Sequence, residues 1–350
     1  MTQNALNSVT MAGGRSGLMM RLLPMSQQLV VVVLLAIEII IFSIVGRNFL
    51  TVENAFEVIR QNVEIGLLAL ALTPVIVAGG IDLSVGSLIA LCAVVLGMSW
   101  QDWGLPLGVA VGVALLIGTA AGLLNGLLIT RLGIAPLIVT LGSMSLFKGL
   151  AEGLMSGRAP FTHFSTWFNE LGNRYLFGFL PEQVLIFVVA AIAFGLLLHR
   201  TTIGRTLVAI GFSFDGARYA GVPVCRRLLL VYCLSGLVAG LAAVIYVARV
   251  GEANAGAGRG YELYAITAVV LGGTSIFGGR GTVAGTLLAL FAIGILRNGL
   301  RLADQPAELA GVLVGTLLIV AIIGNKLINQ LTDLSAGRTL SIRRERGNPT

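Results

Sequence analysis

The stretch "AGGIDLSVGSLIAL", from Ala78 to Leu91, interrupts an apolar run with two glycines, an aspartate and a serine. A similar stretch, "LGGTSIFGGRGTVAGTLLAL", runs from Leu271 to Leu290. Both begin with a Gly-Gly pair and both end in the pattern G-[ST]-L-[LI]-A-L. Because glycine pairs interrupt helices, each stretch predicts a helix that is broken inside an apolar segment.

The composition around these stretches is that of a membrane protein. The chain is 56% hydrophobic and only 11% charged, whereas soluble domains carry roughly 25% charged residues. Its apolar runs reach the length of about 20 residues that a bilayer-crossing helix needs. Since no long polar segment is present, the sequence predicts an all-α polytopic membrane protein without a large soluble domain.

Ten apolar segments are expected to span the membrane, and glycines make the segments near 62–100 and 262–302 the least regular. The transmembrane domain is predicted over 28–325, between a polar tail at 1–27 and a basic tail at 326–350. The expected spans are 28–46, 62–80, 83–100, 105–129, 134–154, 181–199, 228–249, 262–279, 283–302 and 307–325.

The basic residues predict the orientation of these spans. With both termini in the cytoplasm, 14 of the 23 Lys and Arg residues fall on the cytoplasmic side, as the positive-inside rule expects. The net charge of +7 then reflects topology and contact with anionic lipids, not nucleic-acid binding. The predicted location is a bacterial inner membrane.

Motifs for catalysis or ATP hydrolysis are missing from the sequence. The two histidines, His163 and His199, are far apart, and there is no phosphate-binding loop of the form G-x-x-x-x-G-K-[ST]. We therefore expect a transport subunit with no catalytic residue, no metal site and no cofactor of its own. The energy for transport must come from an ion gradient or from a partner that uses ATP and Mg²⁺. Glu38 is the one acidic residue in the middle of a predicted span, and a proton-relay role for it stays open but is disfavoured.

A polar loop at 199–227 is expected to present a short helix outside the membrane. Ser213 suits the N-cap, Asp215 the first turn, and Gly221 the C′ position before Pro223. Such a helix is either an ordinary capped surface helix or the docking element for a cytoplasmic motor.

Four longer motifs resemble the permease subunits of bacterial ABC importers for sugars, most closely the ribose-type permease family. They are "TPVIVAGGIDLSVGSLIAL", "GLLNGLLITRLGIAPLIVTLGSMSLFKGL", "GRTLVAIGFSFDGARYAGVPV" and "ITAVVLGGTSIFGGRGTVAGTLLALFAIGILRNGL". The resemblance covers about residues 30–325 and extends to permeases for rhamnose and for autoinducer-2.

The resemblance implies a bundle of two inverted halves with broken helices. It also implies three partners: a second permease subunit, identical or different, a cytoplasmic ABC ATPase, and a periplasmic sugar-binding protein. The segment Gly211 to Gly221 corresponds to the part of the family that contacts the ATPase. Its candidate coupling residues are Gly211, Ser213, Asp215, Ala217, Arg218 and Gly221.

The two breaks are candidates for a gate or a hinge, with close helix packing through small residues as the simpler alternative. In the predicted topology both breaks face the cytoplasm. Asp82 is expected to cap the following helix more than to bind solute. The candidate residues are Gly79, Gly80, Asp82, Ser84, Gly272, Gly273 and Thr274.

Polar residues inside the predicted spans, among them Asn125, Thr140 and Asn298, either line the pathway or join helices by hydrogen bonds. The expected function is ATP-driven import of a pentose, of a 6-deoxyhexose such as rhamnose, or of autoinducer-2. A branched-chain amino acid permease and an ion-coupled sugar transporter are the alternatives.

Overall fold

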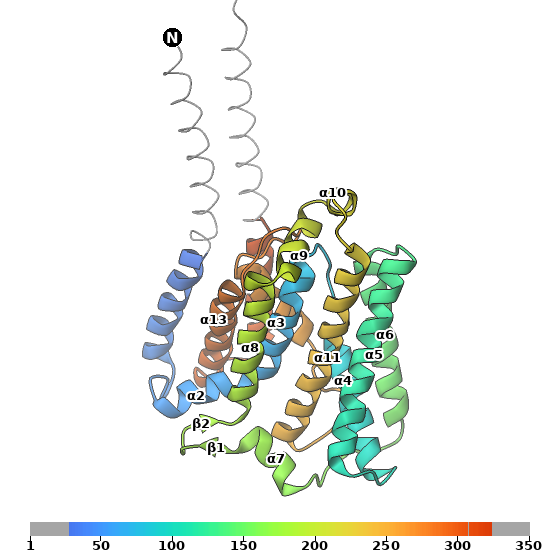
Figure 1. The fold of residues 1–350 in the computed structure, drawn as a ribbon. Coiled ribbons are helices and arrows are strands. Elements are labelled where there is room, and N and C mark those ends of the chain that lie inside the picture. Colours follow the sequence, from blue (N-terminus) through green and yellow to red (C-terminus); the bar gives the residue numbers. More distant parts are fainter. Residues whose placement is uncertain (1–27, 307, 324–350) are drawn as a thin grey trace, which may run out of the picture.

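Apolar helices make up most of the computed structural model, which describes residues 28–306 and 308–323 (Figure 1). The predicted tails, 1–27 and 326–350, lie outside these residues. The described helices are Gln28–Val45, α2 (Val52–Gln61), α3 (Val63–Val77), α4 (Val85–Gln101), α5 (Leu107–Arg131), α6 (Pro136–Met155), α7 (Thr166–Asn173), α8 (Gln183–Arg200), α9 (Thr202–Phe212), α10 (Phe214–Tyr219), α11 (Val224–Val250), α12 (Tyr261–Leu271), α13 (Val283–Leu302) and Glu308–Ile323. A hairpin of β1 (Tyr175–Leu176) and β2 (Leu180–Pro181) precedes α8.

The all-α polytopic prediction is confirmed, and each of the ten predicted spans contains a helix. Within the described residues, six helices are long and apolar enough to cross a membrane, or seven if α2 and α3, which meet at a 50° bend, form one span. The prediction of a full span at 262–279 is wrong, because α12 already ends at Leu271. The chain then continues as an irregular segment to Thr282, where α13 is capped.

The broken elements lie at the centre of the bundle. Every residue of α3 is buried, and α3 packs against α8, α11, α12 and α13. The long helix α11 also packs against α4 and α5. Its contact with α5 is close because Gly118 and Gly122 face Gly236, which lets the two backbones approach. Helix α3 therefore reaches the first break through the interior of the bundle, where protein can satisfy backbone groups that a break leaves free.

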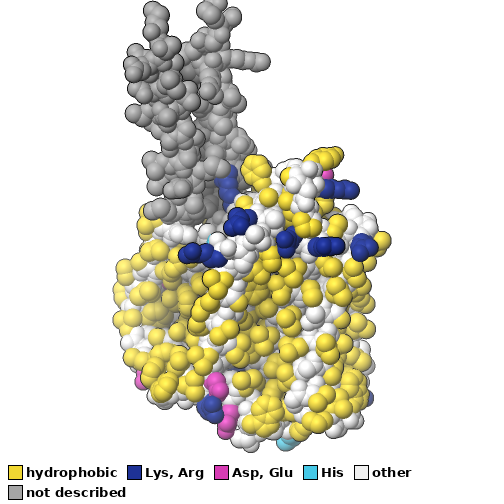
Figure 2. Space-filling model, viewed as in Figure 1, with side chains coloured by type: hydrophobic (Ala, Val, Ile, Leu, Met, Phe, Trp, Pro, Cys, Tyr) yellow, Lys and Arg dark blue, Asp and Glu magenta, His cyan; other side chains and the backbone are white. Residues whose placement is uncertain are grey.

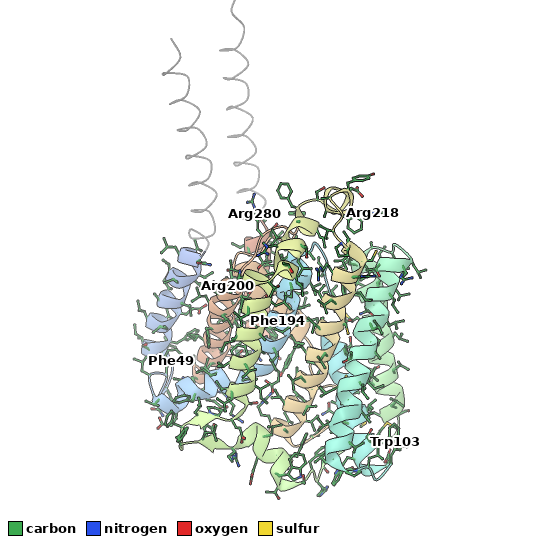
Figure 3. All side chains as sticks on the ribbon, in the orientation of Figure 1. Phe49, Trp103, Phe194, Arg200, Arg218 and Arg280 are labelled. Atoms are coloured by element: carbon green, nitrogen blue, oxygen red, sulfur yellow. The ribbon has the colours of Figure 1, made fainter. Side chains whose placement is uncertain are left out.

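The two ends of the bundle differ in charge. We call them the α10 end, which also holds α9 and both breaks, and the α7 end, which holds α2, α7 and the hairpin (Figure 1). Figure 2 shows a row of basic side chains along the α10 end, and three of its arginines are labelled in Figure 3. The arginines at this end are Arg131, Arg200, Arg205, Arg218, Arg226, Arg227 and Arg280.

Three arginines at the α7 end have carboxylate partners. Arg60 lies 2.7 Å from Glu57, Arg174 lies 2.8 Å from Glu182, and Arg158 pairs with Asp102. Among the residues that the structure describes, no arginine of the α10 end forms an ion pair. The excess positive charge is therefore concentrated at the α10 end, which is the end that the positive-inside rule would assign to the cytoplasm.

Candidate coupling helix and gate

Helix α10 has the caps that its sequence predicts. The hydroxyl of Ser213 accepts a hydrogen bond from the Gly216 N–H at 3.1 Å, and Asp215 lies in the first turn. At the other end, Gly221 adopts φ +80°, and the N–H of Val222 donates to the carbonyl of Ala217 at 3.0 Å. This is the Schellman arrangement, which favours glycine at C′. The caps fix a short helix outside the apolar part of the bundle.

The polar loop 199–227 contains a second helix that the sequence interpretation missed. Helix α9 precedes α10 and buries Gly204, Leu207 and Ile210 against the bundle. The aromatic side chains around α10 point away from it, with Phe212 76%, Phe214 48% and Tyr219 90% exposed. An exposed aromatic group of this kind marks an interaction surface.

Helices α3 and α12 end with the same backbone geometry. Gly79 and Gly273 adopt φ +82° and +93°. The next residue in each case donates its N–H to the carbonyl five residues before it. Gly80 donates to Val75 at 2.9 Å, and Thr274 donates to Val269 at 3.2 Å. Gly79 therefore corresponds to Gly273, and the two Gly-Gly pairs are offset by one residue.

The two broken elements run in the same direction. Both α3 and α12 end at the α10 end, where the N–H of Gly279 donates to the carbonyl of Val77 at 2.8 Å. Inverted repeats would place corresponding breaks at opposite ends, whereas a parallel relation places them together. The expectation that inverted halves relate these two breaks is therefore wrong for this pair.

Gly211, at the end of α9, lies in the contact between the two breaks. A Cβ atom there would lie 1.9 Å from the Val77 carbonyl oxygen and 2.4 Å from the Gly279 nitrogen. Only a residue without a side chain allows this approach. The helix that leads into α10 therefore contacts the end of α3 and the segment after α12 at one point. We call Val77, Gly211 and Gly278–Gly279 the glycine junction.

Asp82 is the centre of a buried polar cluster. One carboxylate oxygen accepts hydrogen bonds from the backbone N–H of Ser84 at 3.0 Å and from its hydroxyl at 2.6 Å. The other accepts from Ser235 of α11 at 2.9 Å, and Asn125 of α5 donates to Ser84 at 3.0 Å. Asp82 thus bonds to the N-cap residue of α4 and joins it to α11; the expectation that its side chain caps α4 is wrong, because no N–H of the helix donates to it. Its side chain is 2% exposed, so it is not open to a solute in this conformation.

A cavity of about 980 Å³ opens beside the first break at the α10 end. Its walls come from the break, the α5–α6 turn, the α9–α10 segment and the start of α11; they include Gly79, Gly80, Arg131, Gly211, Arg218 and Tyr232. The hydroxyl of Tyr232 is buried and has no hydrogen-bond partner among the described residues. The cavity therefore connects the coupling helix with the first break.

The three predicted pathway residues are buried and hydrogen-bonded within the bundle. Thr140 donates to the carbonyl of Ile81 at 3.1 Å, and Asn298 donates to Asn54 at 3.0 Å. Asn125 bonds to Ser84 as described above. These contacts match the helix-joining alternative, and the pathway role stays a prediction. The sequence interpretation also missed Tyr232, Ser235 and Gly278–Gly279; the second Gly-Gly pair in "FGGRG" was the available signal.

Comparison with known proteins identifies the family. Residues 54–322 match the family described as branched-chain amino acid transport system / permease component, and the chain belongs to this family. The predicted kinship with permeases of ABC import systems is thereby confirmed.

The curated relatives are similar along nearly their whole length. The chain is 41% identical over 300 residues to the autoinducer 2 import system permease protein LsrD of Photorhabdus laumondii, covering 84% of this chain and 89% of that protein. It is 40% identical over 306 residues to the protein of the same name in Yersinia enterocolitica, covering 86% and 92%. No solved structure matches the chain. The chain is thus a membrane permease component of a transport system.

Proposed function

We propose that this chain is the membrane subunit of an ATP-driven importer that carries autoinducer 2 into the bacterial cell. The solute is inferred from the 40–41% identity to autoinducer 2 permeases. The mechanism rests on one observation, the glycine junction. There the end of α9, which leads into α10, contacts the end of α3 and the segment after α12.

In this proposal α10 docks on a separate cytoplasmic ATPase, which binds ATP and Mg²⁺. The chain has no phosphate-binding loop, so nucleotide hydrolysis requires a partner. The exposed aromatics Phe212, Phe214 and Tyr219 offer apolar contact area. Asp215 and Arg218 add polar contacts of both signs. The arginines of this end support a cytoplasmic location for it.

The junction gives the ATPase a mechanical route to the gate. A displacement of α10 moves the end of α9, and Gly211 has no free space against Val77 and Gly279. The two breaks must therefore follow, because packed segments shift together and do not compress. Their movement would open or close the cavity of about 980 Å³ beside the first break. Gly79, Gly80, Gly272, Gly273 and Thr274 act as the hinge in this proposal.

The remaining partners follow from the same proposal. A solute-loaded binding protein docks on the α7 end, in the periplasm of a cell whose inner membrane holds the chain. A second permease subunit, identical or different, completes the pathway. The family description favours a second solute, a branched-chain amino acid, and the experiment below includes it.

The test is complementation in Yersinia enterocolitica, whose related permease shares 40% identity with the chain. A strain that lacks that permease receives this chain, and removal of autoinducer 2 and of labelled leucine from the medium is followed. We expect removal of autoinducer 2 to return and leucine uptake to stay unchanged.

A Gly221→Trp variant tests the docking of α10 in the same assay. Position 221 has φ +80° and open space around it, so the change costs only about 1 kcal/mol of backbone strain but places a bulky group at the docking surface. We expect membrane insertion without uptake. An increase in leucine uptake, or a wild-type chain that co-purifies with the ATPase yet imports no autoinducer 2, would refute the proposal.

A further inference from the structure

Helix α6 exposes two charged side chains on a membrane-spanning helix. Lys148 and Glu152 lie 3.8 Å apart, and their side chains are 54% and 58% exposed. Lys148 is seven residues before the end of α6, which places it about 10 Å inside a helix about 30 Å long. Ionised side chains at such depth face a water-filled cavity or a partner, not lipid.

The segment between α11 and α12 enters the bundle to a similar depth. At the α7 end, Ala253 and Phe161 exchange two backbone hydrogen bonds at 2.9 and 3.0 Å, and Phe161 packs on Gly97 of α4. Gly258, five residues later, packs against Gly86 near the start of α4. Gly86 and Gly97 are eleven residue steps apart in α4, which is about 16 Å. The segment 251–260 therefore forms the irregular first half of a crossing that α12 completes, and irregular backbone at this depth is tolerated only against protein or water.

Glu262, in the first turn of α12, lies at the inner end of this segment. A Cβ atom on Gly86 would fall 1.8 Å from its Oε2, so glycine is needed there for the carboxylate to lie against α4. Within the described residues Glu262 has no ion-pair partner, and neither has the exposed Arg259 beside it.

These groups surround one cavity of about 420 Å³. Lys148 and Arg259 supply donors to the cavity, Glu152 and Glu262 supply acceptors, and the hydroxyl of Ser87 can do both. The four charges cancel. Met144 is the one long apolar side chain in the wall, and the other uncharged lining residues are small.

We propose that this cavity is the solute-binding site of the permease and that it takes a neutral, polyhydroxylated solute. Two donors and two acceptors of opposite charge suit adjacent hydroxyl groups, whereas an apolar amino acid side chain would find few partners. The glycines and alanines of the segment 251–260 let a ring approach the backbone closely. This inference rests on the proposed import function. It assigns solute binding to Ser87, Lys148, Glu152, Arg259 and Glu262.

The experiment uses the complete importer, with ATPase and binding protein, reconstituted in vesicles. We expect Glu262→Gln to reduce uptake of autoinducer 2 at saturating binding protein about tenfold or more, because a hydrogen bond to a charged group is lost. ATP hydrolysis stimulated by the binding protein should persist, since the docking helix is untouched. The control is Gly195→Ala in α8, where an added Cβ meets nothing within 4 Å; it should leave uptake unchanged.

A charge-swapped variant separates recognition from helix stability. Lys148→Glu combined with Glu152→Lys keeps the pair and the net charge but exchanges the donor and acceptor positions. We expect uptake to stay low; uptake at the wild-type level would show that the pair only stabilises α6 and would overturn the inference. Wild-type uptake by Glu262→Gln would overturn it too.

Solute protection gives a direct readout of binding. In a Cys225→Ser background, which removes an exposed thiol, a Ser87→Cys variant is labelled with a small maleimide in the assembled importer. We expect autoinducer 2 to slow labelling and leucine to leave it unchanged; rapid labelling unaffected by autoinducer 2 would overturn the site. Import of leucine instead of autoinducer 2 by the wild type would refute the proposed function. If leucine then slowed the labelling of Ser87→Cys, the cavity would bind an amino acid, and the assignment of a polyhydroxylated solute would be overturned.

Discussion

A single methyl group at position 211 should uncouple the ATPase from the gate. In Gly211→Ala the new Cβ would lie 1.9 Å from the Val77 carbonyl oxygen and 2.4 Å from the Gly279 nitrogen, two atoms that belong to one hydrogen bond. Overpacking costs about 1–3 kcal/mol, and loss of the bond about 1 kcal/mol more. Alanine regains up to about 1 kcal/mol of helix propensity.

The net cost of about 1–3 kcal/mol is a 5- to 150-fold shift in the population of the intact junction. Because α10 and its caps are unchanged, the ATPase should still co-purify with the variant. Uptake of autoinducer 2 per ATP hydrolysed should fall. Both quantities are measured in vesicles that contain the complete importer.

Gly195→Ala is the matched control. Gly195 lies in α8, and a Cβ there meets nothing within 4 Å, so the same substitution should leave uptake and coupling unchanged. If Gly211→Ala imports with the wild-type ratio of solute to ATP, the glycine junction does not transmit the motion. Loss of ATPase co-purification would place position 211 in the docking surface instead.

Three further expectations follow from other parts of the bundle. Asp215→Arg should reduce co-purification of the ATPase without lowering the amount of permease in the membrane; unchanged co-purification would contradict the docking role of α10. Arg249 bonds at 2.7 Å to Glu64, which is 0% exposed. Arg249→Met removes this partner and should lower the unfolding free energy by about 3–5 kcal/mol. The double variant with Glu64→Gln should regain part of this stability in a detergent melting assay. In intact cells, a membrane-impermeant maleimide should label Gly157→Cys but not the native, exposed Cys225; the reverse pattern would invert the orientation.

The sequence predicted the parts of the fold that depend on local patterns. Hydropathy located a helix in each of the ten expected segments, and the residues of α10 specified their own caps, because Ser213 and Gly221 act within a few residues of themselves. The two Gly-Gly pairs correctly indicated that helices break there. These features need no knowledge of what packs against them.

Contacts between distant segments were not predictable in this way. Gly211, Val77 and Gly279 come from three separate parts of the chain, and only the fold shows that their backbones touch. The path of 251–260 into the bundle was also missed, since a polar stretch between two apolar helices predicts an external loop. The run "ANAGAGRG" from Ala253 to Gly260 was the available signal, because small residues permit close packing at depth.

The most direct test of the central claim is transport by purified components in sealed vesicles. Vesicles with the complete importer, ATP and Mg²⁺ should accumulate autoinducer 2 when solute-loaded binding protein is present on the α7 side. Vesicles with the permease alone should not accumulate it, whatever ion gradient is imposed. Accumulation driven by an ion gradient, without ATPase or ATP, would contradict the account.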